Sequence, residues 1–263
     1  MADQLDRAGV VLVSISYDSL EVLREFAASH HITFRMLGDV GSRNLERLGL
    51  VDHEIAAHQA EFGIALTDRH LGVAYPSVFL LDPDGLVTQK RIQRNYRLRE
   101  TGATLVEAAL GRRELGVERS ASTPTSGPPV QIDVGLDHPY YRPFQINRMH
   151  FDVRIAPGFH IYTEPIPPGY QSFSIDLEPA EWAVSAPQLP SDTKVLRLEG
   201  LSDEFVVFQT GFAATVPFAV LMRSGSGDAD VTATVRYQAC NDSECFPPVV
   251  KKFSVHLPEE TLN

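Results

Sequence analysis

The sequence is almost free of cysteine: its 263 residues include two, Cys240 and Cys245. Two cysteines exclude a disulfide-rich scaffold. No run approaches the roughly 18 consecutive apolar residues of a membrane-spanning helix, so we expect no membrane span. The N-terminus, MADQLDRAGVVLVS, shows no basic region, apolar region or cleavage site of a secretory signal. A close cysteine pair in an otherwise cysteine-free chain is therefore the most informative feature of the sequence.

Positive charge is also scarce. Lys and Arg total 23 against 34 Asp and Glu, which gives a formal net charge of −11 and a pI near 5.2. We expect neither nucleic acid nor an anionic membrane as a partner, because both are bound by clustered basic side chains. A zinc site needs four ligands, which two cysteines without a second pair or a histidine cluster do not supply. We therefore expect no metal and no cofactor.

A change of composition divides the chain. Residues 120–129, SASTPTSGPP, have no apolar periodicity and are typical of a linker. A length of 263 residues also favours two domains. We assign residues 1–115 to a first domain, 116–130 to the linker and 131–259 to a second domain.

Strand and helix patterns alternate in the first domain. The run VVLVSIS (10–16) is apolar and rich in β-branched residues, as in buried parallel strands. Helices are predicted over 19–31, 43–48 and 100–110, and strands over 77–81 and 86–90 with a turn between them. This order predicts a mixed α/β domain.

Short strand patterns, spaced by ~8–12 residues and separated by Gly, Pro and Asp, fill the second domain. Alternation is clearest in VTATVRYQ, where Val231, Ala233, Val235 and Tyr237 share one face. No long helical pattern interrupts these strands. We predict an antiparallel β-sandwich.

The segments AGVVLVSISYD, ITFRMLGD and AYPSVFLLDPDG resemble the peroxiredoxin (AhpC/TSA) branch of the thioredoxin fold, over about residues 5–110. The resemblance implies a thioredoxin-like domain with Pro76 at the family's cis-proline position. In that family a central strand and a cysteine motif precede the strand that VVLVSIS matches, yet nine residues precede Val10. The resemblance thus implies an incomplete domain without its first strand and cysteine motif, and an exposed apolar slot beside residues 10–16. A truncated start would explain this, and repacking or pairing with a partner is the alternative.

A peroxidatic mechanism requires a thiolate, and residues 1–239 contain no cysteine. We expect no peroxidase activity from this chain. Antioxidant activity of the peroxiredoxin type would belong only to a longer form.

The segment VRYQACNDSECFPPVV resembles the N-terminal domain of the thiol:disulfide interchange protein DsbD, and GFHIYTEPI (158–166) and SDEF (202–205) match two further landmarks of that domain in order. The resemblance covers about residues 130–257 and implies an immunoglobulin-like β-sandwich. It implies that Cys240 and Cys245 are catalytic. It also implies that Phe205 caps the active site, and we expect this cap to pack on one face only. The residues around the site would be Tyr162, Asp203, Glu204 and His160.

The residues themselves are compatible with a redox pair. Four residues between the cysteines can form a turn that returns one cysteine to the other within the ~4.4–6.8 Å that a disulfide allows between Cα atoms. So short a loop removes little chain entropy, which favours a chemical role over a stabilising one. Asp242 and Glu244 should raise the pKa of nearby thiols, so we interpret the pair as an accepting relay.

Three functions stay open. The first is thiol–disulfide exchange, for which the resemblance implies that Cys245 is attacked first and Cys240 resolves, with a thioredoxin-fold redox protein or a DsbD-like transmembrane reductant transporter as partner. The second is a non-catalytic partner-binding module with a structural disulfide. The third is the antioxidant activity of a longer form. The resembled C-terminal domain is typically periplasmic whereas the chain shows no export signal, so the compartment is left open.

Overall fold

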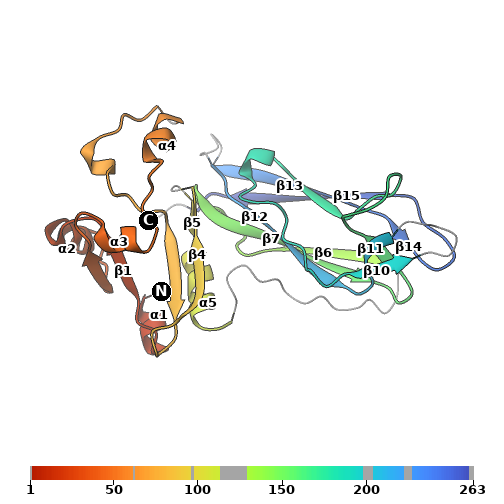
Figure 1. The fold of residues 1–263 in the computed structure, drawn as a ribbon, viewed down its shortest axis with the longest axis horizontal. Helices are drawn as coiled ribbons and strands as arrows, with labels where there is room; N and C mark the ends of the chain where they lie inside the picture. The colour runs from red at the N-terminus through yellow and green to blue at the C-terminus, as the bar shows by residue number, and fades with distance from the viewer. Residues whose placement is uncertain are drawn as a thin grey trace. The chain divides into compact units, whose positions relative to one another are not determined.

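The computed structural model describes residues 2–61, 63–95, 98–112, 129–197, 204–221 and 227–260. The chain divides into two compact units, Met1–Gly116 and Val117–Asn263 (Figure 1). The first is mixed α/β and the second consists mostly of strands. Residues 116–128 of the predicted linker lie outside the described residues.

The first unit opens with a helix and a strand–helix–strand segment. Its elements are α1 (Ala2–Arg7), β1 (Val13–Ser16), α2 (Leu20–Ser29) and β2 (Arg35–Gly38). β1 and β2 are parallel, which the crossover through α2 allows. The Ser19 hydroxyl caps α2 by accepting the Val22 N–H at 3.3 Å. The strand predicted from residue 10 begins only at Val13, because the Val10 N–H closes the end of α1 on the Leu5 carbonyl.

The rest of the first unit is a series of short elements and a hairpin. These are α3 (Arg43–Arg47), α4 (Ile55–Glu61), a 3₁₀ turn at Asp68–His70, β3 (Ser77–Leu81), β4 (Val87–Ile92), β5 (Arg99–Glu100) and α5 (Gly102–Ala109). The predicted turn joins β3 to β4, where Asp82 Oδ1 accepts the N–H groups of Asp84 and Leu86 at 3.0 and 2.9 Å. The sequence analysis missed α4, whose small and polar residues give no apolar stripe.

Within the described residues, the β1–β2 pair and the β3–β4 pair form separate two-stranded sheets. Val13, Ile15 and Leu37 of the first pair are 41–46% exposed. The apolar side chains of this pair are thus partly open to solvent.

The predicted cis-proline at Pro76 is wrong. The cis peptide bonds of the described residues precede Pro165 and Pro179, and the Tyr75–Pro76 bond is not among them. A trans X–Pro bond is preferred by about 0.5–1 kcal/mol unless the surroundings select the cis form. Here the Tyr75 N–H and the Pro76 carbonyl make their hydrogen bonds, to Leu50 and Gln93, without that isomer, both at 2.8 Å.

Within residues 129–197, 204–221 and 227–260, the second unit contains three antiparallel sheets. Its strands are β6 (Val130–Leu136), β7 (Gln145–Ile155), β8 (His160–Tyr162), β9 (Ser174–Glu178), β10 (Lys194–Arg197), β11 (Glu204–Phe208), β12 (Phe212–Phe218), β13 (Asp228–Tyr237), β14 (Ala239–Cys240) and β15 (Val249–Pro258). They pair as β6–β7–β12, β9–β13–β15 and β10–β11–β8–β14.

One apolar core joins the first two of these sheets. The predicted face of β13, with Val231, Ala233, Val235 and Tyr237, is buried in it together with alternate residues of β6, β7, β9 and β12. The predicted alternation is therefore confirmed. Each fully buried aliphatic or aromatic side chain contributes about 1.5–3 kcal/mol to the free energy of folding. This core therefore holds β7, β12 and β13 in place, and the strands of the third sheet extend from them.

Candidate redox site

The third sheet of the second unit carries the first cysteine and most of the residues expected around it. Cys240 ends β14 and lies directly opposite His160 of β8. Tyr162 follows two residues after His160 on the same face, and Val207 of β11 lies opposite Tyr162. Phe205 shares the face of Val207. Strand alternation and register thus gather His160, Tyr162, Phe205 and Cys240 on one side of the sheet.

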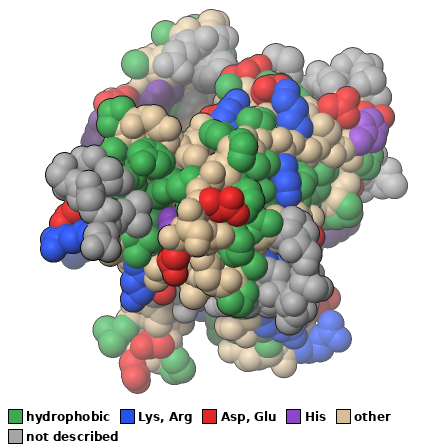
Figure 2. Space-filling view, turned by 90° about the vertical axis from the view of Figure 1, so that its right-hand side faces the viewer, with side chains coloured by type: hydrophobic (Ala, Val, Ile, Leu, Met, Phe, Trp, Pro, Cys, Tyr) green, Lys and Arg blue, Asp and Glu red, His purple; other side chains and the backbone are tan. Residues whose placement is uncertain are grey.

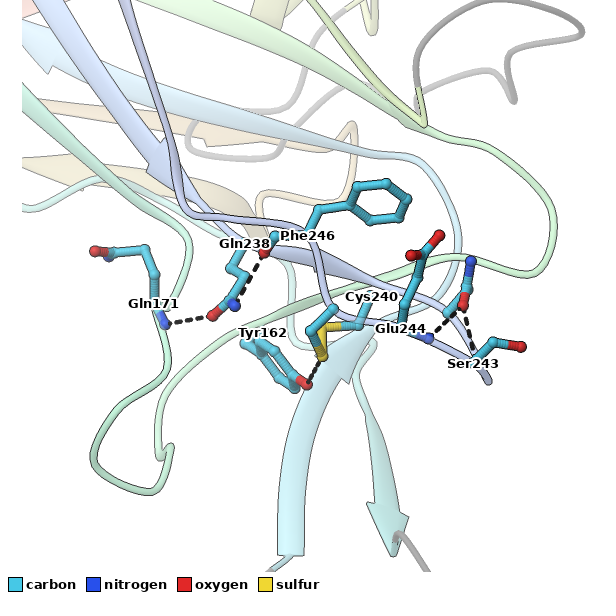
Figure 3. Close-up of a disulfide and its surroundings, with 9 residues drawn as sticks. Tyr162, Gln171, Gln238, Cys240, Ser243, Glu244 and Phe246 are labelled. Atoms are coloured by element: carbon cyan, nitrogen blue, oxygen red, sulfur yellow. Dashed lines mark hydrogen bonds between the residues drawn. A yellow bond between two sulfur atoms is a disulfide. The ribbon is translucent and has the colours of Figure 1, made fainter.

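A tight turn returns the chain from Cys240 to Cys245, and the two form a disulfide (Figure 3). Asn241 organises this turn. Its Oδ1 accepts the N–H groups of Ser243 and Glu244 at 2.8 and 2.9 Å, and its own N–H donates to the Glu244 carbonyl at 2.9 Å. An Asn side chain that closes a turn in this way holds the second cysteine against the first.

The two cysteines differ in their access to solvent. Cys240 is 1% exposed, whereas Cys245 is exposed, as are Pro247 and Pro248 after it. Figure 2 shows the side of the molecule on which β10, β11 and β14 lie in Figure 1, and hydrophobic side chains gather there around a few acidic ones. Exchange requires a thiolate to reach a disulfide sulfur. Of the two cysteines, Cys245 is therefore the one in contact with solvent.

Tyr162 lies against the disulfide from within the sheet. Its side chain is fully buried, and its hydroxyl points to Cys245 Sγ at 3.4 Å (Figure 3). Burial, with a smaller contribution from Tyr170, raises the pKa of Tyr162, so the hydroxyl keeps its proton at neutral pH. A protonated hydroxyl is a hydrogen-bond donor that a Cys245 thiolate would accept.

Phe205 belongs to the same apolar cluster as Tyr162 and Cys240. Its ring centroid lies 5.5 Å from that of Tyr162 and 5.0 Å from that of Tyr170. The side chain is 1% exposed because β11 holds it inside the sheet. The expectation of a cap that packs on one face only is therefore wrong: Phe205 is enclosed.

Glu204 does not join the cysteines. It alternates with Phe205 along β11 and therefore faces the other side of the sheet, where its Oε1 accepts from Arg197 Nε of β10 at 2.8 Å. Its expected place in the active-site surroundings is thus corrected by the strand register. Asp203 lies outside the described residues.

His160 is 5% exposed, and its ring makes an edge-to-face contact with Tyr162 at a centroid separation of 5.4 Å. Burial lowers the pKa of His160, and the charge of Asp242 opposes this shift more weakly. The imidazole is therefore neutral at neutral pH.

Two residues that support the site were not predicted to do so. Gln238 Oε1 accepts the Gln171 N–H, and its Nε2 donates to the Phe246 carbonyl, both at 3.1 Å (Figure 3). Gln238 thereby ties the segment after Cys245 to the loop before β9. Tyr170, which packs on Phe205, comes from a Pro- and Gly-rich stretch whose sequence carries no periodic signal.

Among the described residues, no group of three or more His, Cys, Asp or Glu is placed to hold a metal ion. No helix in the described part of the chain combines the length and apolarity needed to cross a bilayer.

Comparison with protein families gives two matches. Residues 140–257 match the N-terminal domain of the thiol:disulfide interchange protein DsbD, and residues 1–90 match the AhpC/TSA family. Both resemblances inferred from the sequence are thereby confirmed. Together with the disulfide, they support a role in thiol–disulfide redox relay in general.

Three solved structures are similar to parts of the chain. A chain of the complex between the DsbD N-terminal and PilB N-terminal domains from Neisseria meningitidis is 17% identical, with a TM-score of 0.34, and the match covers 50% of this chain and 88% of that one. The reduced DsbD N-terminal domain of the same organism is 18% identical, with a TM-score of 0.27 and coverages of 43% and 82%. The N-terminal periplasmic domain of ScsB from Proteus mirabilis is 13% identical, with a TM-score of 0.34 and coverages of 52% and 49%. Comparison with curated proteins gave no match.

Proposed function

We propose that the chain passes electrons by thiol–disulfide exchange through Cys240 and Cys245, with a thioredoxin-fold protein as partner. The observation that carries this proposal is the unequal exposure of the two cysteines. A disulfide that only closes a loop does not require one cysteine to be exposed and the other buried. An exchange site does, because one sulfur must receive the partner and the other must be kept from side reactions until the second step.

Reduction of the site then takes two displacements. A partner thiolate attacks Cys245 Sγ, the Cys240–Cys245 bond breaks, and Cys240 leaves as a thiolate that takes up a proton. The second partner thiolate attacks the partner's own sulfur in the mixed disulfide and releases Cys245. The partner dithiol is oxidised to a disulfide, the cysteine pair is reduced to a dithiol, and two protons pass from the partner thiols to the cysteines.

The surrounding aromatic residues have distinct parts in this scheme. The Tyr162 hydroxyl, 3.4 Å from Cys245 Sγ, stabilises the thiolate that the second displacement releases. Phe205, enclosed in the same cluster as Cys240, keeps water and small thiols from the buried sulfur.

We also propose that the second unit, with domain bounds near 131–259, is an immunoglobulin-like sandwich, and that the first, near 1–115, is a thioredoxin-like domain without a cysteine motif. The core shared by β6–β7–β12 and β9–β13–β15 supports the first assignment. The strand–helix–strand segment with parallel β1 and β2 supports the second. A DsbD-like transmembrane reductant transporter is the alternative electron partner.

Trapping of the mixed disulfide tests the proposed exchange. The partner is a thioredoxin whose resolving cysteine is replaced by serine and whose remaining thiol is activated with thionitrobenzoate. The Cys240→Ser protein should form a covalent complex that resists further exchange, because Cys245 is open and nothing resolves it. The Cys245→Ser protein should form little complex, because Cys240 is enclosed. Equal complex from both variants, or none from either, would refute the assignment.

A partner-binding module with a structural disulfide is the second candidate. The exposed apolar side chains of the first unit favour it, among them Val11, Leu20 and Val40, since such side chains can dock a protein surface. In that case neither cysteine variant would form the trapped complex, and binding of a partner would survive replacement of both cysteines.

A further inference from the structure

His160 is a buried titratable residue that the two displacements described above do not use. We propose that its imidazole accepts the Cys240 proton when Cys240 attacks a mixed disulfide at Cys245. The inference rests on the proposed exchange and adds a proton-transfer residue to it.

The strand pairing places His160 beside the sulfur it would serve. His160 of β8 and Cys240 of β14 are directly opposite partners in an antiparallel pair. The Cβ atoms of such partners lie about 4.5–5.5 Å apart, with both side chains on the same face. Both side chains are also buried. A proton released by Cys240 therefore meets the imidazole before it meets bulk water.

In the neutral tautomer that carries its hydrogen on Nδ1, the Nε2 atom of this imidazole can take up that proton. Its Nε2 atom is buried and has no hydrogen-bond partner in the structure. A buried ring nitrogen without a partner is unfavourable and calls for an explanation. In the disulfide form, Cys240 has no hydrogen to donate. In the dithiol form its S–H becomes a donor beside the imidazole, so reduction supplies the missing partner.

The charges around His160 suit a base that is protonated only briefly. Tyr162 faces it from its own strand, Cys240 faces it from β14, and Asp242 acts on it from the turn after β14. On its other side, β8 pairs with β11 through the apolar residues Val207 and Phe208. Burial keeps the imidazole neutral at rest, and Asp242 stabilises the imidazolium once it forms.

The Cys240 S–H bond breaks and its proton goes to His160 Nε2, while Cys240 Sγ forms a bond with Cys245 Sγ. The bond between Cys245 and the partner sulfur breaks, the partner leaves as a thiolate, and the imidazolium returns its proton to that thiolate through water. In the opposite direction the partner thiol first gives its proton to the imidazole through water, and the imidazolium then protonates Cys240 as it leaves.

A reaction of the reduced protein with 5,5′-dithiobis(2-nitrobenzoate) separates the steps. Attack by Cys245 releases one thionitrobenzoate in a bimolecular phase, and attack by Cys240 on the resulting mixed disulfide releases a second in a unimolecular phase. His160→Gln should slow the second phase at least tenfold at pH 7, within the range of a lost general base. Its rate should then rise about tenfold per pH unit, since only the Cys240 thiolate fraction remains to limit it. The first phase should keep its wild-type rate.

His160→Phe keeps the ring contact with Tyr162 but has no ring nitrogen, so it should slow the second phase to the same extent. This variant keeps the test valid if His160→Gln fails to fold. His256→Gln, at an exposed histidine of β15, is the control and should leave both phases unchanged. A second phase with unchanged rate and pH profile, or a parallel slowing of both phases, would overturn the role of His160. A separate experiment tests the proposed exchange itself: if that exchange does not occur, the wild-type disulfide will not react with reduced thioredoxin.

Discussion

Phe205 and Phe208 lie three residues apart on β11 and point into different cores. Phe205 packs with Tyr162 and Cys240, whereas Phe208 stacks on Phe212 in the main core at a centroid separation of 4.1 Å. Both side chains are buried to a similar degree. Residue type, strand and burial are therefore matched, and the two positions differ in whether they adjoin the disulfide.

This pair gives a direct test of shielding at the residue scale. Phe205→Leu should speed reduction of the disulfide by dithiothreitol severalfold, because it opens Cys240 Sγ to attack in addition to the exposed Cys245. Phe208→Leu should leave the rate unchanged. Both substitutions should cost less stability than the ~3–5 kcal/mol typical of Phe→Ala in a core. Pseudo-first-order reduction rates and thermal midpoints of the two variants provide the measurement, and equal rates would end the assignment of Phe205 as a shield.

The sequence predicted the site residues unevenly. The positions of Tyr162, His160 and Phe205 near Cys240 follow from motifs that resemble a known domain, and strand register brings them together. Glu204 was misplaced, because a motif names neighbours in sequence while alternation sends them to opposite faces. The solvent exposure of Cys245 could not be predicted, because it depends on how the turn after β14 packs against the rest of the sheet.

At the scale of elements, Asp39 links β2 to α3. Its carboxylate accepts the N–H groups of Asn44 and Leu45, both at 2.9 Å, and the Asn44 side chain at 2.8 Å. The Leu45 hydrogen bond is the largest cause that lowers the pKa of Asp39 below its ordinary value of 3.8, with help from Asn44 and against the effect of burial. The ionised form therefore stabilises the start of α3.

Asp39→Asn should lower the thermal midpoint of the first unit by a few degrees at pH 7. Because the folded pKa is lowered, the contribution of Asp39 is complete above about pH 4 and disappears as the pH falls through the folded pKa. The difference between variant and wild type should therefore shrink toward zero in acid. Asp84→Asn, in the exposed turn between β3 and β4, is the control for charge alone. A difference that grows as the pH falls would contradict this account.

Elements with a strong local signal were predicted well. The helix capped by Ser19 and the strand over residues 77–81 needed only capping and apolar runs. The helix α4 was not visible because its small and polar residues give no apolar stripe, and the two-residue strand β14 is too short to show a period. The isomer at Pro76 was also beyond the sequence, because surrounding contacts select it.

At the scale of the whole molecule, the two units differ in how well they bury apolar side chains. The largest fully buried side chains, among them Phe151, Phe218 and Leu257, all lie beyond residue 129. Most large exposed apolar side chains of the described residues lie between Val11 and Val87. The second unit should therefore be the more stable, because burial of apolar area is the main favourable term in folding.

Limited proteolysis tests this difference. Cleavage should begin within residues 1–128 and leave a resistant fragment that starts near residue 130, as seen by mass spectrometry of a time course. The full chain in denaturant is the control for intrinsic cleavage sites. Equal resistance of both units would show that the first unit is stable without further covering.

Peroxide turnover should be absent from this chain. Residues 1–239 contain no cysteine to act as a peroxidatic thiolate. A protein with Cys240→Ser and Cys245→Ser should therefore consume hydroperoxide at the background rate in a coupled assay with thioredoxin and its reductase. Turnover above background in that variant would require another reducing group in the first unit.

Two-domain organisation was predictable at this scale, because composition and periodicity change along the chain. The third sheet was not. It joins β8, β10, β11 and β14 from four separate stretches of sequence, and pairing of this kind depends on contacts that no local pattern encodes.

The reduction potential of the Cys240–Cys245 disulfide distinguishes an electron relay from a structural disulfide. It is obtained by equilibrating the full chain in glutathione buffers and separating the alkylated dithiol and disulfide forms. An electron relay requires a potential within reach of thioredoxin-fold partners, and we expect a value near about −200 mV. A value below about −300 mV would mark a structural disulfide and contradict the proposed exchange.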